Sequence, residues 1–361
     1  MVDKLFHQFP VYGYMKNQAV YEPTVEDEYT YDKIIEANAR YLEEQVEGEN
    51  ASAQEQENAQ PQEGADQETA QKEPLQKEAS EEAENPSVSG AEIASAAAEP
   101  QVEISREQLE NYDYLLNNFF IVDSTTAVDG ARINAPGLLD LDMTLEKNPD
   151  APQILIYHTH SQEGFADSVE GKTEDTVIGV GDHLAGILQD QYGYGVIHNT
   201  GTYDVVDGVI DRNSAYDYSM AAVEQILAEN PSIEVVIDLH RDGVAEDRRL
   251  VTEVNGKPTA KFMFFNGLSY SALNGEVTYL PNPYIQENLA FSFQLNLQAA
   301  RFYPGLSRNI YLSSLRYNLH LRPRAILLEA GAQTNTVQEV KNAMAPFAEI
   351  LDQVLQGRTG Q

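Results

Sequence analysis

The chain has 361 residues, 42% of them hydrophobic, and a formal net charge of −35. Because proteins bind phosphate backbones through Lys and Arg, this acidic balance argues against a nucleic-acid partner. The absence of cysteine excludes disulfides and thiolate metal sites, and it is consistent with an extracytoplasmic protein. No apolar run approaches the roughly 20 residues of a membrane-spanning helix, so the sequence predicts a soluble chain.

Composition divides the chain into three parts. Residues 48–103 consist mainly of Glu, Gln, Ala, Ser and Pro and contain no aromatic residue, which predicts a disordered acidic linker. Residues 1–47 form an N-terminal segment, in which residues 32–46 have apolar positions near helical spacing. Residues 104–361 form one large domain, to which we assign all of the chemistry.

Strand and helix patterns alternate in the first half of this domain. The expected elements are, in chain order, a strand at residues 154–157, a helix at 176–191, a short strand ending at His198, a helix at 214–229 and a strand at 233–239. The last of these runs is strongly β-branched, which is typical of a strand that is buried on both faces. This alternation predicts a parallel sheet.

The pattern then changes. Two β-rich runs flank Asn255-Gly256, a dipeptide that favours a tight hairpin turn, so we expect an antiparallel addition there. The remaining expected elements are a helix at residues 284–301, strands at 309–313 and 324–328, and a closing helix at 336–355. The predicted fold is α/β, with three layers in the order helix, sheet, helix and a mostly parallel central sheet plus an antiparallel hairpin.

Histidine and acidic residues follow three of the predicted strands. His158, His160 and Glu163 follow the first strand, His240 follows the second, and Glu329 follows the last. The carboxyl ends of parallel strands meet at one edge of a sheet, where open α/β folds place their active sites. Imidazole and carboxylate suit Zn²⁺, which in catalytic sites takes three protein ligands and one water. The sequence therefore predicts a zinc site at this edge.

Several assignments stay open from the residues alone. His158 and His160 are two positions apart, so in an extended backbone both would face the same side, and either or both could bind the metal. For Asp238 and Asp242, an N-cap, a salt bridge or a role in orienting His240 is favoured over direct ligation. His183 and His198 are interpreted as structural, because no acidic neighbour distinguishes them.

Four ordered motifs carry a resemblance to a known family. They read PQILIYHTHSQEGF, IDLHRDG, YNLHL and ILLEAGAQTNTVQEV, and together with residues 109–126 they resemble the stage II sporulation protein P family. The resemblance covers residues 109–355. It implies a zinc-dependent N-acetylmuramoyl-L-alanine amidase that also has endopeptidase activity and acts on peptidoglycan during engulfment of the forespore. YNLHL departs from the expected pattern at His320, which receives no catalytic role.

The resemblance also implies roles for single residues. His160 is favoured over His158 as a zinc ligand, beside Glu163 and His240, while Glu329 would be the general base for the attacking water. Arg241 would hold the developing oxyanion or a substrate carboxylate, with a salt bridge as the alternative.

Two other function classes stay open, namely a peptidoglycan endopeptidase that uses the same metal and a non-catalytic wall-binding module. The implied partners are peptidoglycan and the stage II sporulation proteins D and M. The implied location is extracytoplasmic, on the cell-wall side of a membrane. The family's N-terminal membrane anchor rests on the resemblance alone.

Overall fold

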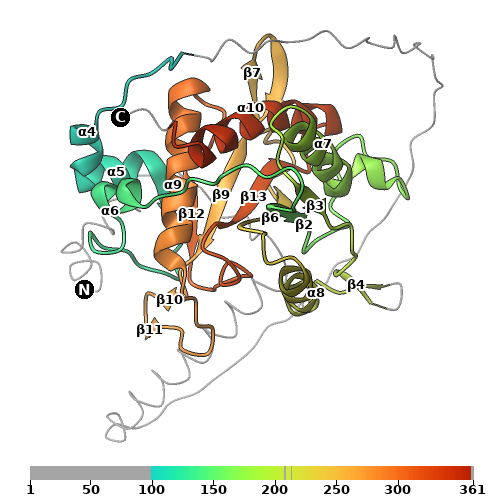
Figure 1. Cartoon of the computed structure of the whole chain (residues 1–361), viewed down its shortest axis with the longest axis horizontal. Helices are drawn as coiled ribbons and strands as arrows, with labels where there is room; N and C mark the ends of the chain where they lie inside the picture. The colour runs from blue at the N-terminus through green and yellow to red at the C-terminus, as the bar shows by residue number, and fades with distance from the viewer. Residues whose placement is uncertain (1–98, 207–208, 213, 359–361) are drawn as a thin grey trace, which may run out of the picture. The chain divides into compact units, whose positions relative to one another are not determined.

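The computed structural model describes residues 99–206, 209–212 and 214–358 (Figure 1). The predicted N-terminal helix at residues 32–46 and the acidic linker up to residue 98 lie outside the described residues. Within the predicted domain at 104–361, the described residues form helices and strands from α4 to α10.

Seven strands form the central sheet, in the order β1-β12-β9-β13-β6-β2-β3. Their bounds are β1 Phe120–Val122, β2 Ile154–Tyr157, β3 Val196–His198, β6 Val235–Asp242, β9 Phe262–Gly267, β12 Ile310–Ser313 and β13 Ala325–Ala332. All neighbouring strands are parallel except β9 and β13, which are antiparallel. The prediction of a mostly parallel sheet is confirmed.

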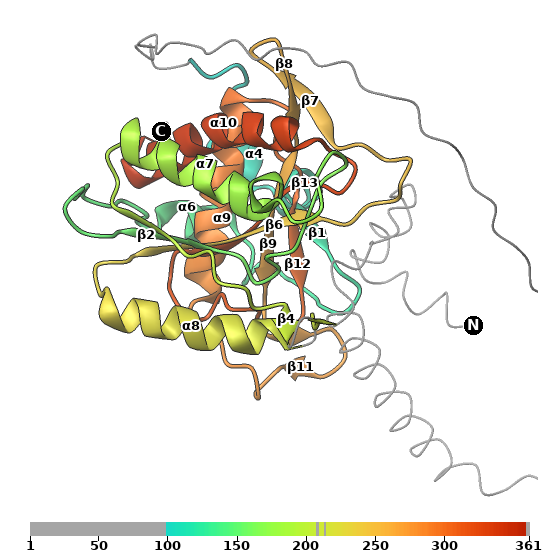
Figure 2. The same cartoon turned by 90° about the vertical axis from the view of Figure 1, so that its right-hand side faces the viewer.

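Helices cover both faces of the sheet, which confirms the predicted three layers. Helices α7 (Val177–Asp190), α9 (Ile285–Phe302) and α10 (Val337–Leu355) pack against one face and share the larger apolar core with it. Helix α8 (Ala215–Glu229) packs against the other face, where a second core gathers Leu155, Val236 and Leu327. Figure 2 shows α8 on the side of the strands opposite α7 and α10.

Local sequence signals explain where the major helices begin. The Thr176 side chain accepts a hydrogen bond from the Ile178 backbone N–H at the start of α7. At the start of α10, Thr336 and Glu339 cap each other's backbone N–H groups, an arrangement typical of a helix N-terminus. Three short helices lie near the start of the described chain. Helices α4 (Arg106–Glu110) and α5 (Tyr112–Phe119) precede β1, and α6 (Ala135–Asp140) follows it.

The predicted hairpin is present as β7 (Val251–Val254) and β8 (Lys257–Ala260). Asn255 and Gly256 both have positive φ angles, 52° and 76°, as a two-residue hairpin turn of this kind requires. The apolar run that follows β8 is not part of the hairpin, however. It forms β9, which enters the central sheet between β12 and β13.

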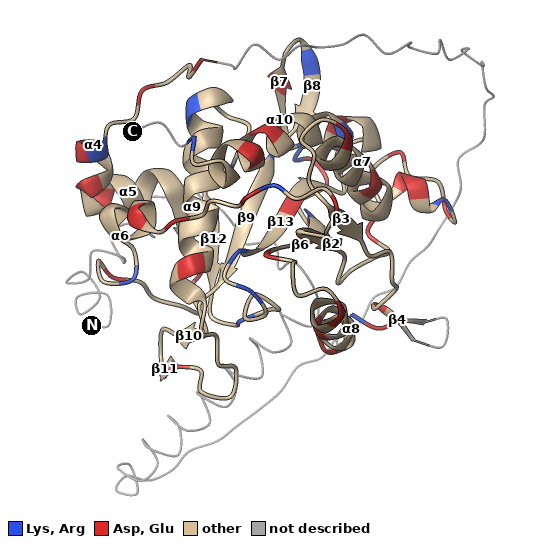
Figure 3. Cartoon of the chain, viewed as in Figure 1, with Lys and Arg blue, Asp and Glu red and all other residues tan. Residues whose placement is uncertain are grey.

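Short helices and strands complete the fold, and many acidic residues lie on the outer helices. The remaining elements are the 3₁₀ helix at Thr173–Asp175 and the short strands β4 Val205–Val206, β5 Val209–Ile210, β10 Tyr270–Ser271 and β11 Gly275–Glu276. Acidic residues are spread over the outer helices, including α7, α8 and α10 (Figure 3). Within the described ranges, no helix combines the length and apolarity needed to cross a membrane.

The three strands that the sequence analysis singled out are neighbours, in the order β13-β6-β2. Strands β6 and β13 are longer than predicted, so His240 and Glu329 lie inside their strands rather than after them. Side chains alternate between the faces of a strand, and Val236 and Leu327 belong to the core under α8. His240 and Glu329 therefore lie on the α8 face of the sheet.

Candidate active site

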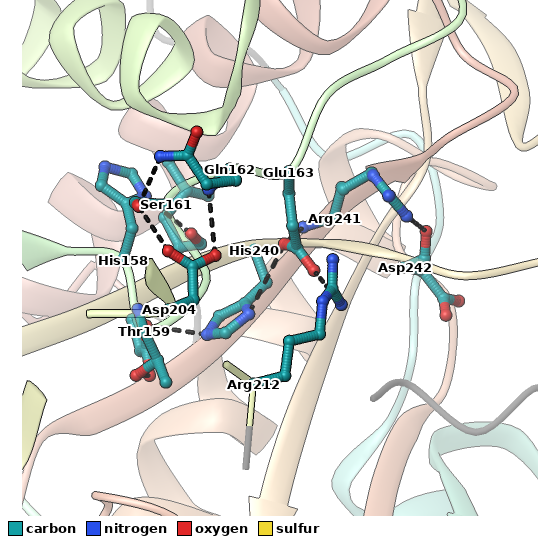
Figure 4. A network of polar contacts seen from close by, with 12 residues as sticks. His158, Thr159, Ser161, Gln162, Glu163, Asp204, Arg212, His240, Arg241 and Asp242 are labelled. Carbon is teal, nitrogen blue, oxygen red and sulfur yellow. Dashed lines mark hydrogen bonds and ion pairs between the residues drawn. The ribbon is translucent and has the colours of Figure 1, made fainter. Parts of the chain in front are cut away.

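Four buried titratable side chains converge on this face. The rings of His160 and His240 meet edge to face, with centroids 5.3 Å apart. Oε2 of Glu163 lies 3.6 Å from Nδ1 of His240 (Figure 4). Glu329 is the register partner of His240 on the neighbouring strand. Each of the four residues is only 2% exposed. Because burying such groups is costly, their gathering here marks the strongest functional candidate in the described chain.

The loop that follows β2 places His160 and Glu163 at the site. Asp204, which is fully buried, accepts hydrogen bonds from Ser161 Oγ at 2.6 Å and from the Gln162 backbone N–H at 3.1 Å. The carbonyl oxygen of Glu163 accepts from the backbone N–H of Val177, at the start of α7. Asp204 was missed by the sequence analysis, because nothing in its local sequence distinguishes it.

Glu163 is held on both carboxylate oxygens. The backbone N–H of Arg241 donates to Oε2 at 3.0 Å, and the guanidinium of Arg212 lies 3.6 Å from Oε1. The guanidinium of Arg241 instead donates to the carbonyl of Asp242, pointing along its own strand (Figure 4). Arg212, which the sequence analysis did not select, is thus the arginine whose charge faces Glu163, while a catalytic role for Arg241 stays a prediction.

Asp238 holds the other nitrogen of His240. Its Oδ1 atom lies 2.8 Å from Nε2 of His240 and accepts the backbone N–H of Thr159 at 2.9 Å. Its Oδ2 atom accepts the Thr159 hydroxyl at 2.7 Å. Burial alone would raise the pKa of the Asp238 carboxyl, but His240 and Thr159 together bring that pKa below its usual value. Asp238 therefore stays ionised, in the position of a residue that orients His240.

His158 and His160 have different neighbours. Nδ1 of His158 lies 2.7 Å from the carbonyl oxygen of Leu239, and its Nε2 lies 2.8 Å from Nε2 of His198. His160 instead packs edge-on against His240 and against Tyr216 of α8. Because the chain leaves extended structure after Tyr157, the same-side expectation for the two histidines does not describe this geometry.

The His158–His198 pair lies under α7. Asp182 of α7 contacts Nδ1 of His198 at 2.7 Å. A Cβ atom at Gly181 would lie 2.6 Å from Nε2 of His198 and 2.8 Å from Nε2 of His158, so only glycine fits there. Burial and the neighbouring His198 lower the pKa of His158 to about 3, which keeps its ring neutral. His198 thus contacts both His158 and an acidic residue, Asp182, which the sequence analysis did not identify as its neighbour.

Glu329 lies beside an irregularity in β13. The register of β13 with β6 shifts between Glu329 and Ala332, so that β13 carries one extra residue there. Gly331, inside this bulge, has a φ of 68° and lies close to Val340 of α10. Bulges of this kind redirect side chains and are frequent beside active sites.

The remaining singled-out residues have partners outside the four converging side chains. Asp242 forms an ion pair with Arg308, and burial raises the pKa of its carboxyl. His320 lies in the loop after β12, where burial and Arg316 lower its pKa to about 4.

Asn318, in the same YNLHL motif, donates hydrogen bonds to Ser219 and to the carbonyl of Tyr216 in α8. Asn318 and Ser219 are therefore parts of the site that the sequence analysis missed.

The side chains suit a zinc ion by donor type. Across residues 99–206, 209–212 and 214–358, no group of three or more His, Asp or Glu side chains is arranged as a ready metal cluster. Two ligand atoms about 2.1 Å from a tetrahedral zinc lie about 3.4 Å apart, whereas Glu163 Oε2 and His240 Nδ1 are 3.6 Å apart. His160, Glu163 and His240 thus have donor types suited to zinc, and the Glu163–His240 pair has a separation near that of two ligands.

Comparison with known sequences gives a family match. The sequence profile of "Stage II sporulation protein P (SpoIIP)" matches residues 14–352. A curated relative, "Stage II sporulation protein P" of Bacillus subtilis (strain 168), is 25% identical over 219 residues. That match covers 57% of this chain and 51% of the relative, so the chain spans about half of the length of the relative it matches.

Comparison with solved structures gives weaker likenesses. The N-acetylmuramoyl-L-alanine amidase AmiC2 of Nostoc punctiforme is 12% identical and has a TM-score of 0.34, over 60% of this chain and 100% of that chain. The amidase Ami1 of Mycobacterium smegmatis is 13% identical and has a TM-score of 0.35, over 58% of this chain and 98% of that chain.

Proposed function

Because the chain belongs to the stage II sporulation protein P family, we propose that it is a sporulation peptidoglycan hydrolase of the zinc-dependent N-acetylmuramoyl-L-alanine amidase type. The observation that carries this proposal is the gathering of His160, Glu163 and His240 beside Glu329, all buried on one face of the sheet. The reaction would hydrolyse the amide between the lactyl group of muramic acid and the first L-alanine.

His160, Glu163 and His240 would hold the zinc ion. When bound, zinc lowers the pKa of a coordinated water toward neutrality and polarises the scissile carbonyl. The residues around this centre would keep it in place: Asp238 orients His240, and the backbone N–H of Arg241 together with Arg212 orients Glu163. Such outer contacts fix ligand orientation and raise metal affinity.

Glu329 would act as the general base and general acid. Glu329 is the register partner of His240 on the adjacent strand, which supports a role close to the proposed ligands. In that position it would accept a proton from the attacking water and pass it to the departing amine of L-alanine. Arg212 would balance negative charge near Glu163, and Arg241 keeps its proposed role of holding the developing oxyanion or a substrate carboxylate.

The remaining parts of the proposal rest on family membership. Action on the cell-wall side of the membrane and in engulfment, together with the stage II sporulation proteins D and M as partners, is proposed on that basis alone. Endopeptidase activity at the same centre is the second candidate, because the proposed centre would polarise any amide carbonyl presented to it.

Product analysis tests the proposal. Purified peptidoglycan is incubated with the full chain, with and without added zinc and after chelation, and the products are identified by mass spectrometry. An amidase releases stem peptides that begin with L-alanine and leaves glycan strands free of peptide. An endopeptidase removes crosslinks but leaves the stems attached to the glycan. If neither product forms with zinc bound, the enzyme assignment is wrong.

A further inference from the structure

The four-residue turn from His160 to Glu163 carries two of the three proposed zinc ligands, and Asp204 contacts both of the residues between them. We propose that Asp204 is a positioning residue that preforms this turn in the metal-free protein and thereby sets the affinity for zinc. The consequence for zinc rests on the proposed function, whereas the preformed turn can be measured without metal.

The backbone of the turn alone holds it only weakly. The Glu163 N–H donates to the carbonyl oxygen of His160 at 3.5 Å. This distance lies beyond the usual range of about 2.7–3.2 Å, so the bond contributes little to closing the turn. At the exit, the carbonyl oxygen of Glu163 accepts the backbone N–H of Val177, the first residue of α7, at 3.0 Å. The spacing of the two ligands therefore depends on contacts made by the two central residues.

Asp204 supplies those contacts from one carboxylate. Ser161 Oγ donates to Oδ1 at 2.6 Å, and the Gln162 backbone N–H donates to Oδ2 at 3.1 Å (Figure 4). The Gln162 side chain donates to Ser161 Oγ at 3.0 Å, so this hydroxyl donates once and accepts once. Asp204 and Ser161 are both buried. Because Ser161 is shielded from water, loss of the Asp204 carboxylate would leave its hydroxyl without this acceptor, which is costly.

The segment that carries Asp204 is itself anchored to the sheet. Asn199, directly after β3, donates its backbone N–H to the carbonyl oxygen of Ile156 in β2 at 2.8 Å. Its side-chain oxygen accepts the Gly201 N–H and the Tyr203 hydroxyl, each at 2.8 Å. A Cβ atom at Gly201 would lie 2.5 Å from that hydroxyl oxygen, so the backbone approaches it closely. Asp204 therefore reaches the turn from a fixed starting point.

The base of the β4–β5 hairpin brings a second contact to the same turn. The backbone N–H of Asp211 donates to the carbonyl oxygen of Asp204 at 2.8 Å, which joins the two sides of the hairpin base. The next residue, Arg212, lies 3.6 Å from Oε1 of Glu163. One side of the base thus holds the middle of the turn, and the other side faces its last residue. Ligands that are held before metal arrives lose less conformational entropy on binding, which raises affinity.

Substitutions at Asp204 separate its hydrogen bonds from its bulk. Asp204→Leu has a similar size but no acceptor, so the bonds from Ser161 and Gln162 are both lost. Asp204→Asn keeps one oxygen, which should face the Gln162 N–H, because an NH₂ group there would oppose another donor. The NH₂ group then faces the Ser161 hydroxyl, which has a lone pair to accept it. The two variants therefore differ in whether the middle of the turn stays held.

Amide exchange in the metal-free full chain tests the preformed turn. Glutamine is labelled selectively with ¹⁵N, and the Gln162 amide is assigned by its loss in Gln162→Ala. We expect hydrogen exchange at this amide to become at least about tenfold faster in Asp204→Leu, because protection requires an acceptor, and to stay near the parent rate in Asp204→Asn. An unchanged rate in Asp204→Leu would overturn the inference.

Zinc affinity tests the consequence. The zinc dissociation constant, measured by competition with a chelator, should rise roughly 10- to 100-fold in Asp204→Leu and stay within about threefold of the parent in Asp204→Asn. The matched control is Asp167→Ala. Asp167 lies on the same loop but accepts the Val337 N–H at the start of α10, at 2.8 Å. Its loss should lower the free energy of unfolding and leave zinc affinity unchanged. Equal losses of zinc affinity in Asp204→Leu and Asp167→Ala would refute a specific role for Asp204.

Ser161→Ala keeps the test informative if Asp204→Leu fails to fold. It removes one of the two donors, so it should speed the Gln162 exchange and raise the zinc dissociation constant by a smaller factor. No change in either quantity would overturn the inference. A parent that binds no zinc but shows Asp204-dependent protection would refute the proposed function and leave the preformed turn standing. Zinc binding that is equal with and without the Asp204 carboxylate would refute the inference and leave the proposed function standing.

Discussion

The Nε2 atoms of His158 and His198 lie 2.8 Å apart, and this contact separates His158 from the proposed metal ligands. Nδ1 of His158 faces the carbonyl of Leu239, so it must carry hydrogen, and the neutral ring then accepts a hydrogen bond from His198 at Nε2. Both nitrogens of His158 are thereby used in joining β2, β3 and β6. His160, two residues later, packs against His240 instead.

The first prediction distinguishes the two histidines. His158→Gln should keep zinc at the parent stoichiometry but lower the free energy of unfolding by about 1–3 kcal/mol, because it disrupts buried hydrogen bonds. His160→Ala should lose zinc with a smaller effect on the metal-free fold. Metal analysis and urea denaturation of both variants decide the question. Loss of zinc in His158→Gln with retention in His160→Ala would reverse the assignment.

The second prediction concerns where the folded domain begins. The backbone N–H groups of Gln101 and Val102 both donate to the carbonyl of Arg301 at the end of α9, and the Gln101 side chain donates to Phe302. A variant that begins at residue 99 should therefore unfold cooperatively, whereas one that begins at residue 104 should be less stable by about 1–3 kcal/mol. Equal denaturation midpoints would show that residues 99–103 contribute nothing. The full chain carrying Gln101→Ala is the control for the side-chain bond alone.

The third prediction is a pH dependence that arises from His320. Burial and Arg316 lower the pKa of His320 in the folded state to about 4, whereas an unfolded histidine titrates near pH 6.5. Below about pH 6.5 the unfolded state binds the proton first, so stability falls as the pH drops from about 6.5 to about 4. His320→Gln should flatten this fall. Denaturant midpoints of metal-free protein, measured across that range, give the two slopes, and identical slopes would contradict the assignment.

The fourth prediction isolates the base. Glu329→Gln keeps the shape of the side chain but removes the proton acceptor, so zinc should stay bound while peptidoglycan hydrolysis falls roughly 10²- to 10⁴-fold. Glu339→Gln, which alters an acidic residue in the cap of α10, is the matched control and should retain activity. Zinc content, peptidoglycan sedimentation and product release are measured on the same preparations. Loss of zinc in Glu329→Gln would make Glu329 a ligand, and activity within about threefold of the parent would remove its catalytic role.

The sequence predicted the parts of the fold that local patterns determine. The apolar runs at β2, β6 and β13 have the length of buried strands, β6 is also rich in β-branched residues, and Asn255-Gly256 specifies its own turn. The central placement of β9 was missed, because its residues follow β8 almost directly and were read as part of the same hairpin strand. The bulge after Glu329 also has no local signal, since it appears only when β13 pairs with β6.

The same division applies to the candidate site. His160, Glu163, His240 and Glu329 were identifiable because each follows or ends an apolar run in a parallel sheet. Asp204, Ser219 and Asn318 were not, because each is a single polar residue on a loop or helix that acts only through tertiary hydrogen bonds.

The measurement that most directly tests the account is the zinc content of the purified full chain and of its His240→Ala variant. His183→Ala is the matched control, because His183 lies on the exposed side of α7. We predict about one zinc ion per chain in the parent and in His183→Ala, and almost none in His240→Ala, because a three-ligand site seldom keeps its affinity with two ligands. Full zinc occupancy in His240→Ala, or none in the parent, would contradict a metal centre built on the ends of β2 and β6.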